Sequence, residues 1–254
     1  MSILTIAKIA AKVPSSWKYQ ATALRPLYIR LLRLGNRKAW IQLHTGTGFF
    51  WNIDELTSQT FLLGTYEGYM QAALYRYLTL GSVFFDVGAH AGFHSLVAAT
   101  LVGPSGRVFA FEPNPRAQQS VMRQVAANPL LPVALLPFAV LDRCGTVRFS
   151  AKRVGSAQSH VDPTGDTMVE ARTLDSVVAD QLAPPPSVIK IDVEGAESAV
   201  LDGAMKVITT HRPVVLCDEN DKSTLAMVVK KLAPLGYEIL PGPPITAVPA
   251  KTGM

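Results

Sequence analysis

The sequence predicts an α/β fold with a mainly parallel, doubly wound sheet and right-handed crossovers. Short apolar runs alternate with stretches of helical periodicity over residues 82–236, which is the pattern of repeated strand and helix units. The first run, "SVFFDV", contains few polar residues, as is typical of a strand buried on both faces of its sheet. Glycine and proline, as in the pair at 103–104, mark the ends of the units.

The alternating units follow one another in order along the chain. Strands are expected at residues 82–87, 106–113, 133–140, 187–195 and 213–220, and helices at residues 92–103, 115–128, 173–182, 196–209 and 222–236. Thr173 is the expected N-cap of its helix. Residues 237–240 and 245–250 are joined only by "PGPP", so we expect them to form an antiparallel pair.

Two regions depart from this alternation. Ahead of it, residues 40–44 and 49–54 predict a small hairpin, and the helix that follows ends before Gly81. Within it, residues 145–150 and 167–173 predict two strands around a long polar loop. Loops of this length in compact domains often face the substrate or move, and we expect one of these roles here.

The positive charge of the chain is concentrated in its first segment. Residues 1–53 contain eight Lys or Arg and no Asp or Glu, which leaves 16 basic and 19 acidic side chains for the rest. We therefore divide the chain into a basic amphipathic helical extension, residues 1–40, and one domain, residues 41–254. Two interpretations of the extension stay open: it packs on the domain or on a second copy of the chain, or it makes a peripheral contact with an anionic membrane.

Composition excludes several classes of protein. The two cysteines, Cys144 and Cys217, have no paired spacing, so neither a disulfide framework nor a zinc site is expected. No apolar run approaches the roughly 20 residues of a membrane span, and a secretion signal is not evident, so we expect a cytoplasmic protein that is at most peripheral to the membrane. The basic segment lacks a recognisable nucleic-acid module, so nucleic acid is not an expected partner.

The stretch "FFDVGAHAGFHS" predicts a ligand loop between the first strand and its helix. Gly88 and Gly92 allow the backbone to approach a ligand closely, and the helix offers its N-terminus. Glu112 ends the next strand, 20 residues beyond Gly92, where a carboxylate can accept hydrogen bonds from two ribose hydroxyls. Asp86 would repel a pyrophosphate but suits the ammonium and sulfonium of S-adenosylmethionine, so this cofactor is predicted in preference to NAD.

Several stretches in consistent order resemble the FkbM family of S-adenosylmethionine-dependent methyltransferases. They are "FFDVGAHAGFHSLVAA", "GRVFAFEPNP", "TLDSV", "VIKIDVEGAESAVLDGA" and "RPVVLCDEN", and "IKIDVEGAE" is the most specific of them. The resemblance covers roughly residues 45–250 and implies a Rossmann-like class I methyltransferase fold, with a seven-stranded sheet and a C-terminal antiparallel strand. The family's loop commonly has Asn where His90 stands, a substitution that keeps a polar side chain.

The resemblance also implies a cofactor site. Its residues would be Glu67, Asp86, Gly88, Ala89, His90, Gly92, Glu112, Pro113, Asn114, Ala139, Val140 and Asp192. The residues at 86–92 would line the methionine end, and Glu112 would hold the ribose. Residues 113–114 and 139–140 would border the two edges of the adenine.

Methyl transfer to oxygen requires alignment of the acceptor with the methyl group and often a base for the hydroxyl proton. Four carboxylates fall at strand ends: Asp192, Glu194, Asp218 and Glu219. We expect Asp192, Glu194 and Glu219 to be catalytic at the acceptor. The same carboxylates could instead hold a divalent cation such as Mg²⁺ that binds two acceptor oxygens, and His160 in the polar loop is a further candidate base.

The predicted function is O-methylation of a hydroxyl of a sugar, glycolipid or polyketide-like metabolite, where the acceptor is a small molecule or is linked to a glycan or lipid. A nicotinamide-dependent Rossmann oxidoreductase is the alternative enzyme, and the loop and the lack of a Tyr-x-x-x-Lys pair argue against it. A third hypothesis is a non-catalytic protein that retains the cofactor and binds a membrane or a partner.

Overall fold

A seven-stranded sheet forms the centre of the protein. The computed structural model describes residues 38–150, 160–161, 164–218 and 221–250. The order of the central strands is β12 (Tyr237–Leu240), β13 (Ile245–Pro249), β11 (Val214–Cys217), β10 (Val188–Ile191), β3 (Val83–Val87), β4 (Arg107–Phe111) and β5 (Val133–Leu136). The strands from β11 to β5 are parallel, whereas β13 is antiparallel to both of its neighbours. The predicted α/β class, the seven strands and the C-terminal antiparallel strand are confirmed.

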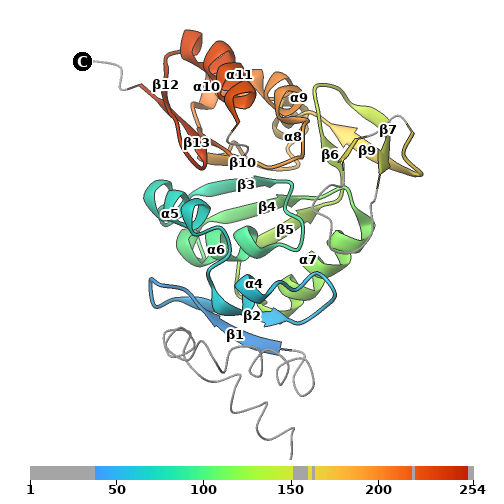
Figure 1. The fold of residues 1–254 in the computed structure, drawn as a ribbon, viewed down its shortest axis with the longest axis vertical. Coiled ribbons are helices and arrows are strands. Elements are labelled where there is room, and N and C mark those ends of the chain that lie inside the picture. The colour runs from blue at the N-terminus through green and yellow to red at the C-terminus, as the bar shows by residue number, and fades with distance from the viewer. Residues whose placement is uncertain (1–37, 151–159, 162–163, 219–220, 251–254) are drawn as a thin grey trace, which may run out of the picture.

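Helices cover both faces of this sheet (Figure 1). One face carries α5 (Gly68–Tyr77), α6 (Phe93–Val102) and α7 (Pro115–Ala127), with the short α4 (Gln59–Leu63) beyond them. The other face carries α8 (Leu174–Ala179), α9 (Glu197–Asp202), α10 (Met205–His211) and α11 (Lys222–Leu232), which continues into the 3-10 turn η2 (Ala233–Leu235). Thr173 caps α8 by accepting a hydrogen bond from the backbone N–H of Ser176, as expected.

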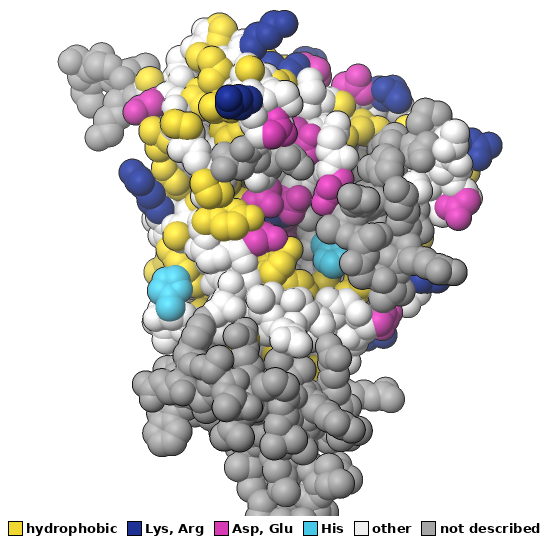
Figure 2. Space-filling view, viewed as in Figure 1, with side chains coloured by type: hydrophobic (Ala, Val, Ile, Leu, Met, Phe, Trp, Pro, Cys, Tyr) yellow, Lys and Arg dark blue, Asp and Glu magenta, His cyan; other side chains and the backbone are white. Residues whose placement is uncertain are grey.

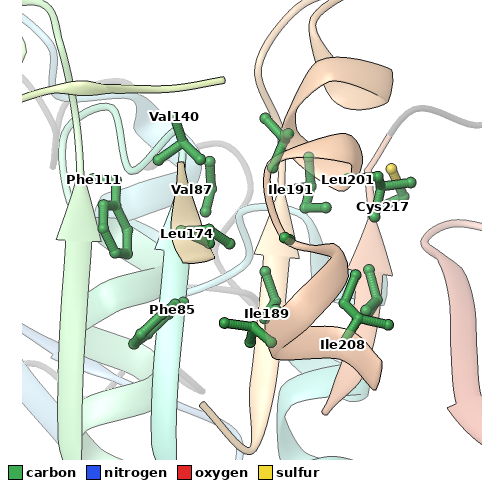
Figure 3. Packing of buried hydrophobic residues seen from close by; sticks show 14 of the residues in the cluster. Phe85, Val87, Phe111, Val140, Leu174, Ile189, Ile191, Leu201, Ile208 and Cys217 are labelled. Atoms are coloured by element: carbon green, nitrogen blue, oxygen red, sulfur yellow. The ribbon is translucent and has the colours of Figure 1, made fainter. Parts of the chain in front are cut away.

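Alternate residues of each central strand pack into two separate cores. Phe84 and Val188 belong to the core on the α5–α6 side, whereas Phe85 and Ile189 belong to the core under α8–α11 (Figure 3). Successive side chains of a strand point to opposite faces, so a strand with helices on both sides must be apolar along its whole length. This explains why the strands appear in the sequence as continuous apolar runs.

A β-hairpin extends the α5–α7 side and is held by side-chain amides. The strands β1 (Lys38–Gln42) and β2 (Gly48–Asn52) pair as predicted from the sequence. The side chains of Gln124 in α7 and of Asn128, the C-cap residue of this helix, each donate to and accept from the backbone of β2, at 2.7–3.0 Å. The amides therefore satisfy an edge strand that would otherwise expose unpaired backbone groups.

Two expected elements are each divided in the structure, and each division has a physical reason. The strand expected at 133–140 ends at Leu136, because Pro137 has no N–H to continue the ladder, and β6 (Ala139–Val140) pairs instead with β9 (Thr167–Arg172). The helix expected at 196–209 breaks at Gly203, where a Cβ would lie 2.0 Å from the carbonyl oxygen of Leu141. The Asp175 carboxylate accepts hydrogen bonds from two N–H groups of the restarted helix, at 2.8 and 3.0 Å.

A second sheet, of four strands, lies at the end of the central strands where the chain continues from β5 into β6 (Figure 1). Its other strands are β7 (Gly145–Ser150), β8 (His160–Val161) and β9, which confirms the two strands expected around the polar loop. Most of that loop and the predicted helices of the N-terminal extension lie outside the described residues. Among the described residues, none of the helices is long and apolar enough to span a membrane.

Candidate active site

A cavity opens at the carboxyl ends of β3, β4 and β10, where ligands bind in open α/β sheets. The structure brings ten of the predicted site residues to its walls: Glu67, Gly88, His90, Glu112, Pro113, Asn114, Ala139, Val140, Asp192 and Glu194. Asp86, Ala89 and Gly92 are not among the lining residues. Glu219 lies outside the described residues, and the side chain of His160 is likewise not described.

The turn after β3 is shaped by close backbone contact. Gly88 has a φ of +82°, and a Cβ at this position would lie 1.7 Å from the carbonyl oxygen of Asp192. His90 also has a positive φ, of +49°, and Gly92 is the N-cap residue of α6. Only glycine can occupy position 88 without moving β10 away, so the loop and the end of β10 are fixed against each other.

Glu112 is buried at the end of β4 and accepts two backbone hydrogen bonds. Its Oε2 accepts from the N–H of His90 at 2.7 Å, and its Oε1 accepts from the N–H of Asn114 at 2.8 Å. Burial raises the pKa of Glu112 to about 7, although both hydrogen bonds act in the opposite direction. Glu112 therefore connects the turn after β3 with the turn after β4, and its carboxylate lies at the cavity wall.

Asp86 lies behind the cavity, which corrects the interpretation that its charge faces a cationic ligand directly. It is fully buried, its Oδ2 accepts a 2.6 Å hydrogen bond from Ser95 of α6, and its Oδ1 lies 3.2 Å from Nζ of Lys190. The reason is the strand register: Lys190 is the direct neighbour of Asp86 on β10, and both side chains point to the same face.

Lys190 links the buried Asp86 to residues at the cavity wall. Its Nζ also lies 3.1 Å from Oδ2 of Asp192 and donates to the Gly88 carbonyl oxygen at 3.3 Å. Burial by itself lowers the pKa of a lysine, but the carboxylates of Asp192 and Asp86 outweigh it and raise the pKa of Lys190 well above its ordinary value. Lys190 is therefore a permanent cation beneath the loop.

A second group of acidic residues stands at the other side of the loop. Glu67 is held in a left-handed conformation, with φ +42°, at the start of α5, and Asp218 follows β11. Burial, together with the charge of Asp218, raises the pKa of Glu67 to about 7, and burial together with the charge of Asp192 raises the pKa of Asp218. Burial lowers the pKa of His94 to about 3, so this imidazole, 3.6 Å from Glu67, is neutral and the contact is not a salt bridge.

The rest of the cavity wall is apolar. The aromatic rings of Phe111, Phe138 and Phe149 line it together with Ala139 and Val140. The cavity thus combines an apolar wall suited to a flat base with the buried carboxylate of Glu112, which suits a ribose diol. Its acidic end, formed by Glu67, Asp192 and Asp218, suits a cation. These residues fit S-adenosylmethionine, which carries all three chemical features.

The comparison with known families agrees with this chemistry. The model of the Methyltransferase FkbM domain matches residues 86–239, more than half of the chain. The chain belongs to the FkbM methyltransferase family. A methyltransferase domain is the class of enzyme that the sequence analysis predicted in preference to an oxidoreductase.

Individual relatives of this FkbM-family chain are distant. The hexuronic acid methyltransferase AglP of Haloferax volcanii is 28% identical over 137 residues, which are 53% of this chain and 54% of that protein. The chain thus spans about half the length of this curated relative. Among solved structures, the FkbM methyltransferase of Methylobacillus flagellatus KT is 17% identical with a TM-score of 0.48, covering 77% of this chain and 55% of that one. Fibrillarin of Aeropyrum pernix, with natively bound S-adenosyl-L-methionine, is 12% identical with a TM-score of 0.49, covering 82% and 92%.

The sequence analysis missed Lys190 and the aromatic wall of this FkbM-family site. A lysine in the middle of the apolar run "SVIKIDV" was a usable signal, because a buried lysine requires a carboxylate partner. Phe138 and Phe149 carry no comparable signal, since a phenylalanine in a core and one in a cavity wall look alike in a sequence.

Proposed function

We propose that the protein transfers the methyl group of S-adenosylmethionine to a hydroxyl of a sugar, glycolipid or polyketide-like metabolite. The observation that carries the proposal is that Asp192 and Glu194 line the same cavity as Gly88 and Glu112. Acidic groups that can take a proton therefore share one cavity with the residues suited to the cofactor. The relative named a hexuronic acid methyltransferase supports a sugar as the acceptor.

Different residues would bind the cofactor and act on the acceptor. Glu112 would accept hydrogen bonds from the ribose, and the Asp192 carboxylate would lie toward the positive charge of the donor. The acceptor oxygen forms a bond to the methyl carbon as the carbon–sulfur bond breaks, and the sulfonium leaves as a neutral thioether. Glu194, which is exposed at the cavity, would take the hydroxyl proton, with Glu219 as a further candidate for this role. The proposal requires S-adenosylmethionine alone, and a divalent cation would be an addition to it.

The test is transfer of labelled methyl from S-adenosylmethionine by the full-length protein to hexoses, hexuronic acids and their nucleotide- or lipid-linked forms. A methyl ether is stable to mild alkali, whereas a methyl ester formed on a hexuronic acid carboxylate is hydrolysed. We expect alkali-stable label, and turnover at least about 100-fold lower for Glu194→Gln. Glu238→Gln, an exposed carboxylate on β12, is the matched control. Label that is entirely alkali-labile would contradict the hydroxyl acceptor, and full activity of Glu194→Gln would contradict its role.

A further inference from the structure

Three carboxylates from distant parts of the chain converge at the acidic end of the cavity. Glu67 precedes α5, Asp192 follows β10 and Asp218 follows β11. One carboxylate oxygen from each lies within 4.8 Å of the other two, and all three residues line the cavity. Acidic side chains gather near the middle of the face shown in Figure 2. Negative charges this close repel one another, and either protonation of a carboxyl group or a nearby positive charge relieves the repulsion.

The positive charge that the protein supplies is not sufficient. Lys190 is the one Lys or Arg among the buried residues of the described ranges, and it pairs with Asp86 and Asp192. In the part of the chain that the structure describes, neither Glu67 nor Asp218 has a Lys or Arg nitrogen within 4.0 Å. One cation therefore faces four carboxylates.

Unsatisfied polar atoms provide an independent indication of a ligand. Oε2 of Glu67 and Oδ1 of Asp218 are buried and have no hydrogen-bond partner among the described residues. His94 is only 4% exposed, and its Nε2 also lacks a partner. This nitrogen points at Oε2 of Glu67 from 3.6 Å, which is longer than a hydrogen bond. Buried polar atoms are nearly always satisfied, so Oε2 of Glu67 and Oδ1 of Asp218 indicate that a bound ion, another ligand or water completes this part of the site.

We propose that Glu67, Asp192 and Asp218 bind a divalent cation that prefers oxygen ligands, such as Mg²⁺, and that His94 orients the Glu67 carboxylate from behind. The 4.8 Å limit equals the separation of oxygens on opposite sides of Ca²⁺, about 4.8 Å, and slightly exceeds that for Mg²⁺, about 4.2 Å. Carboxylates that bind a metal are usually held in place by hydrogen bonds from groups outside the coordination shell.

The site differs from the one that the sequence suggested. Glu67, which the family resemblance assigned to the cofactor site, is assigned here to the ion. Glu194 and Glu219 keep their predicted role at the acceptor. All three carboxylates line the cavity, so an ion that they held would be accessible to acceptor oxygens. Only this role for the ion rests on the proposed function, because binding of the ion itself requires neither cofactor nor acceptor.

The test is a titration of the full-length protein with Mn²⁺, followed by the electron paramagnetic resonance of the free ion, and with Mg²⁺ by calorimetry. We expect one ion per chain in the wild type, and affinity at least tenfold lower in Glu67→Gln and in Asp218→Asn. Glu238→Gln should match the wild type, and circular dichroism shows whether each variant is folded. An absence of saturable binding to the wild type, or equal affinity in all folded variants, would overturn the inference.

Methyl transfer measured in parallel separates this inference from the proposed function. If Mn²⁺ binds as expected but no acceptor is methylated, the ion site stands and the proposed function fails. If Mn²⁺ does not bind and transfer proceeds at the full rate with a chelator present, the ion site fails and the proposed function stands.

Discussion

Cofactor binding should become tighter as the pH rises through 7, because Glu112 must ionise to hold a ribose. Burial raises the pKa of Glu112 to about 7 in the free protein. Two ribose hydroxyls donate to a carboxylate and thus favour its ionised form, so binding releases a proton wherever Glu112 is still protonated. A group with pKa 7 is about 9% ionised at pH 6 and about 91% ionised at pH 8, which corresponds to a roughly tenfold gain in affinity.

The stability of the free protein should change with pH in the opposite direction. The folded pKa of Glu112 is above its ordinary value of 4.5, so the folded state binds the proton more tightly than the unfolded state. The free energy of unfolding therefore falls as the pH rises from about 4.5 to about 7, by at most about 3 kcal/mol from this group. Opposite slopes for stability and for cofactor affinity would be hard to obtain from a nonspecific effect of pH.

Calorimetric titration with S-adenosylhomocysteine between pH 6 and pH 8 measures this effect, and buffers of different ionisation enthalpy report the protons released. The charged groups near Glu112 are Asp86 and Lys190, which pair with each other, and His90, whose pKa is lowered by burial. Glu112→Gln is the control, because it cannot ionise, while the amino group of the ligand titrates equally in both proteins. Equal pH dependence in wild type and Glu112→Gln would refute the reasoning.

Two further predictions concern Lys190 and Gly88, which hold the walls of the site in place. Lys190→Met should lower the free energy of unfolding by about 3–5 kcal/mol, because it leaves Asp86 buried without its cation, and adding Asp86→Asn should restore part of the loss in denaturant titrations. Gly88→Ala should abolish binding of S-adenosylhomocysteine, because its Cβ would lie 1.7 Å from a backbone oxygen. Gly46→Ala is the matched control, since Gly46 has a similar φ of +85° but no atom within 4 Å of an added Cβ, and its binding should be unchanged.

The central sheet could be predicted from the sequence because its physical requirement is local. Each parallel strand must be apolar on both faces, as Phe84 and Phe85 are, and each ends at a glycine, proline or acidic residue that the sequence displays. The strand expected at 133–140, which the structure divides, contains the residue responsible, because Pro137 cannot donate to a ladder. The turn residues Gly88 and Glu112 were predictable for the same reason, since they directly follow strands.

The acidic end of the site depends on strand order, which the sequence does not display. Asp86 and Lys190 become partners only because β10 lies beside β3, although the helices α6, α7 and α8 and several strands separate them along the chain. Glu67 reaches the site through a left-handed backbone conformation ahead of α5, and no residue pattern marks such a conformation in a glutamate. The pairing of charges therefore required the structure.

The charge of the cavity determines which acceptor oxygen can approach the methyl group. A neutral sugar hydroxyl meets no net repulsion from Glu67, Asp192 and Asp218, and a carboxylate such as Glu194 can take its proton. A sugar acid brings a negative charge, and two unit charges 4 Å apart repel by about 4 kcal/mol at an effective dielectric constant of 20. A divalent cation among the three carboxylates would offset two of their charges and could bind the acceptor carboxylate directly. We therefore expect methyl transfer to an acidic sugar to depend on the ion more strongly than transfer to a neutral sugar.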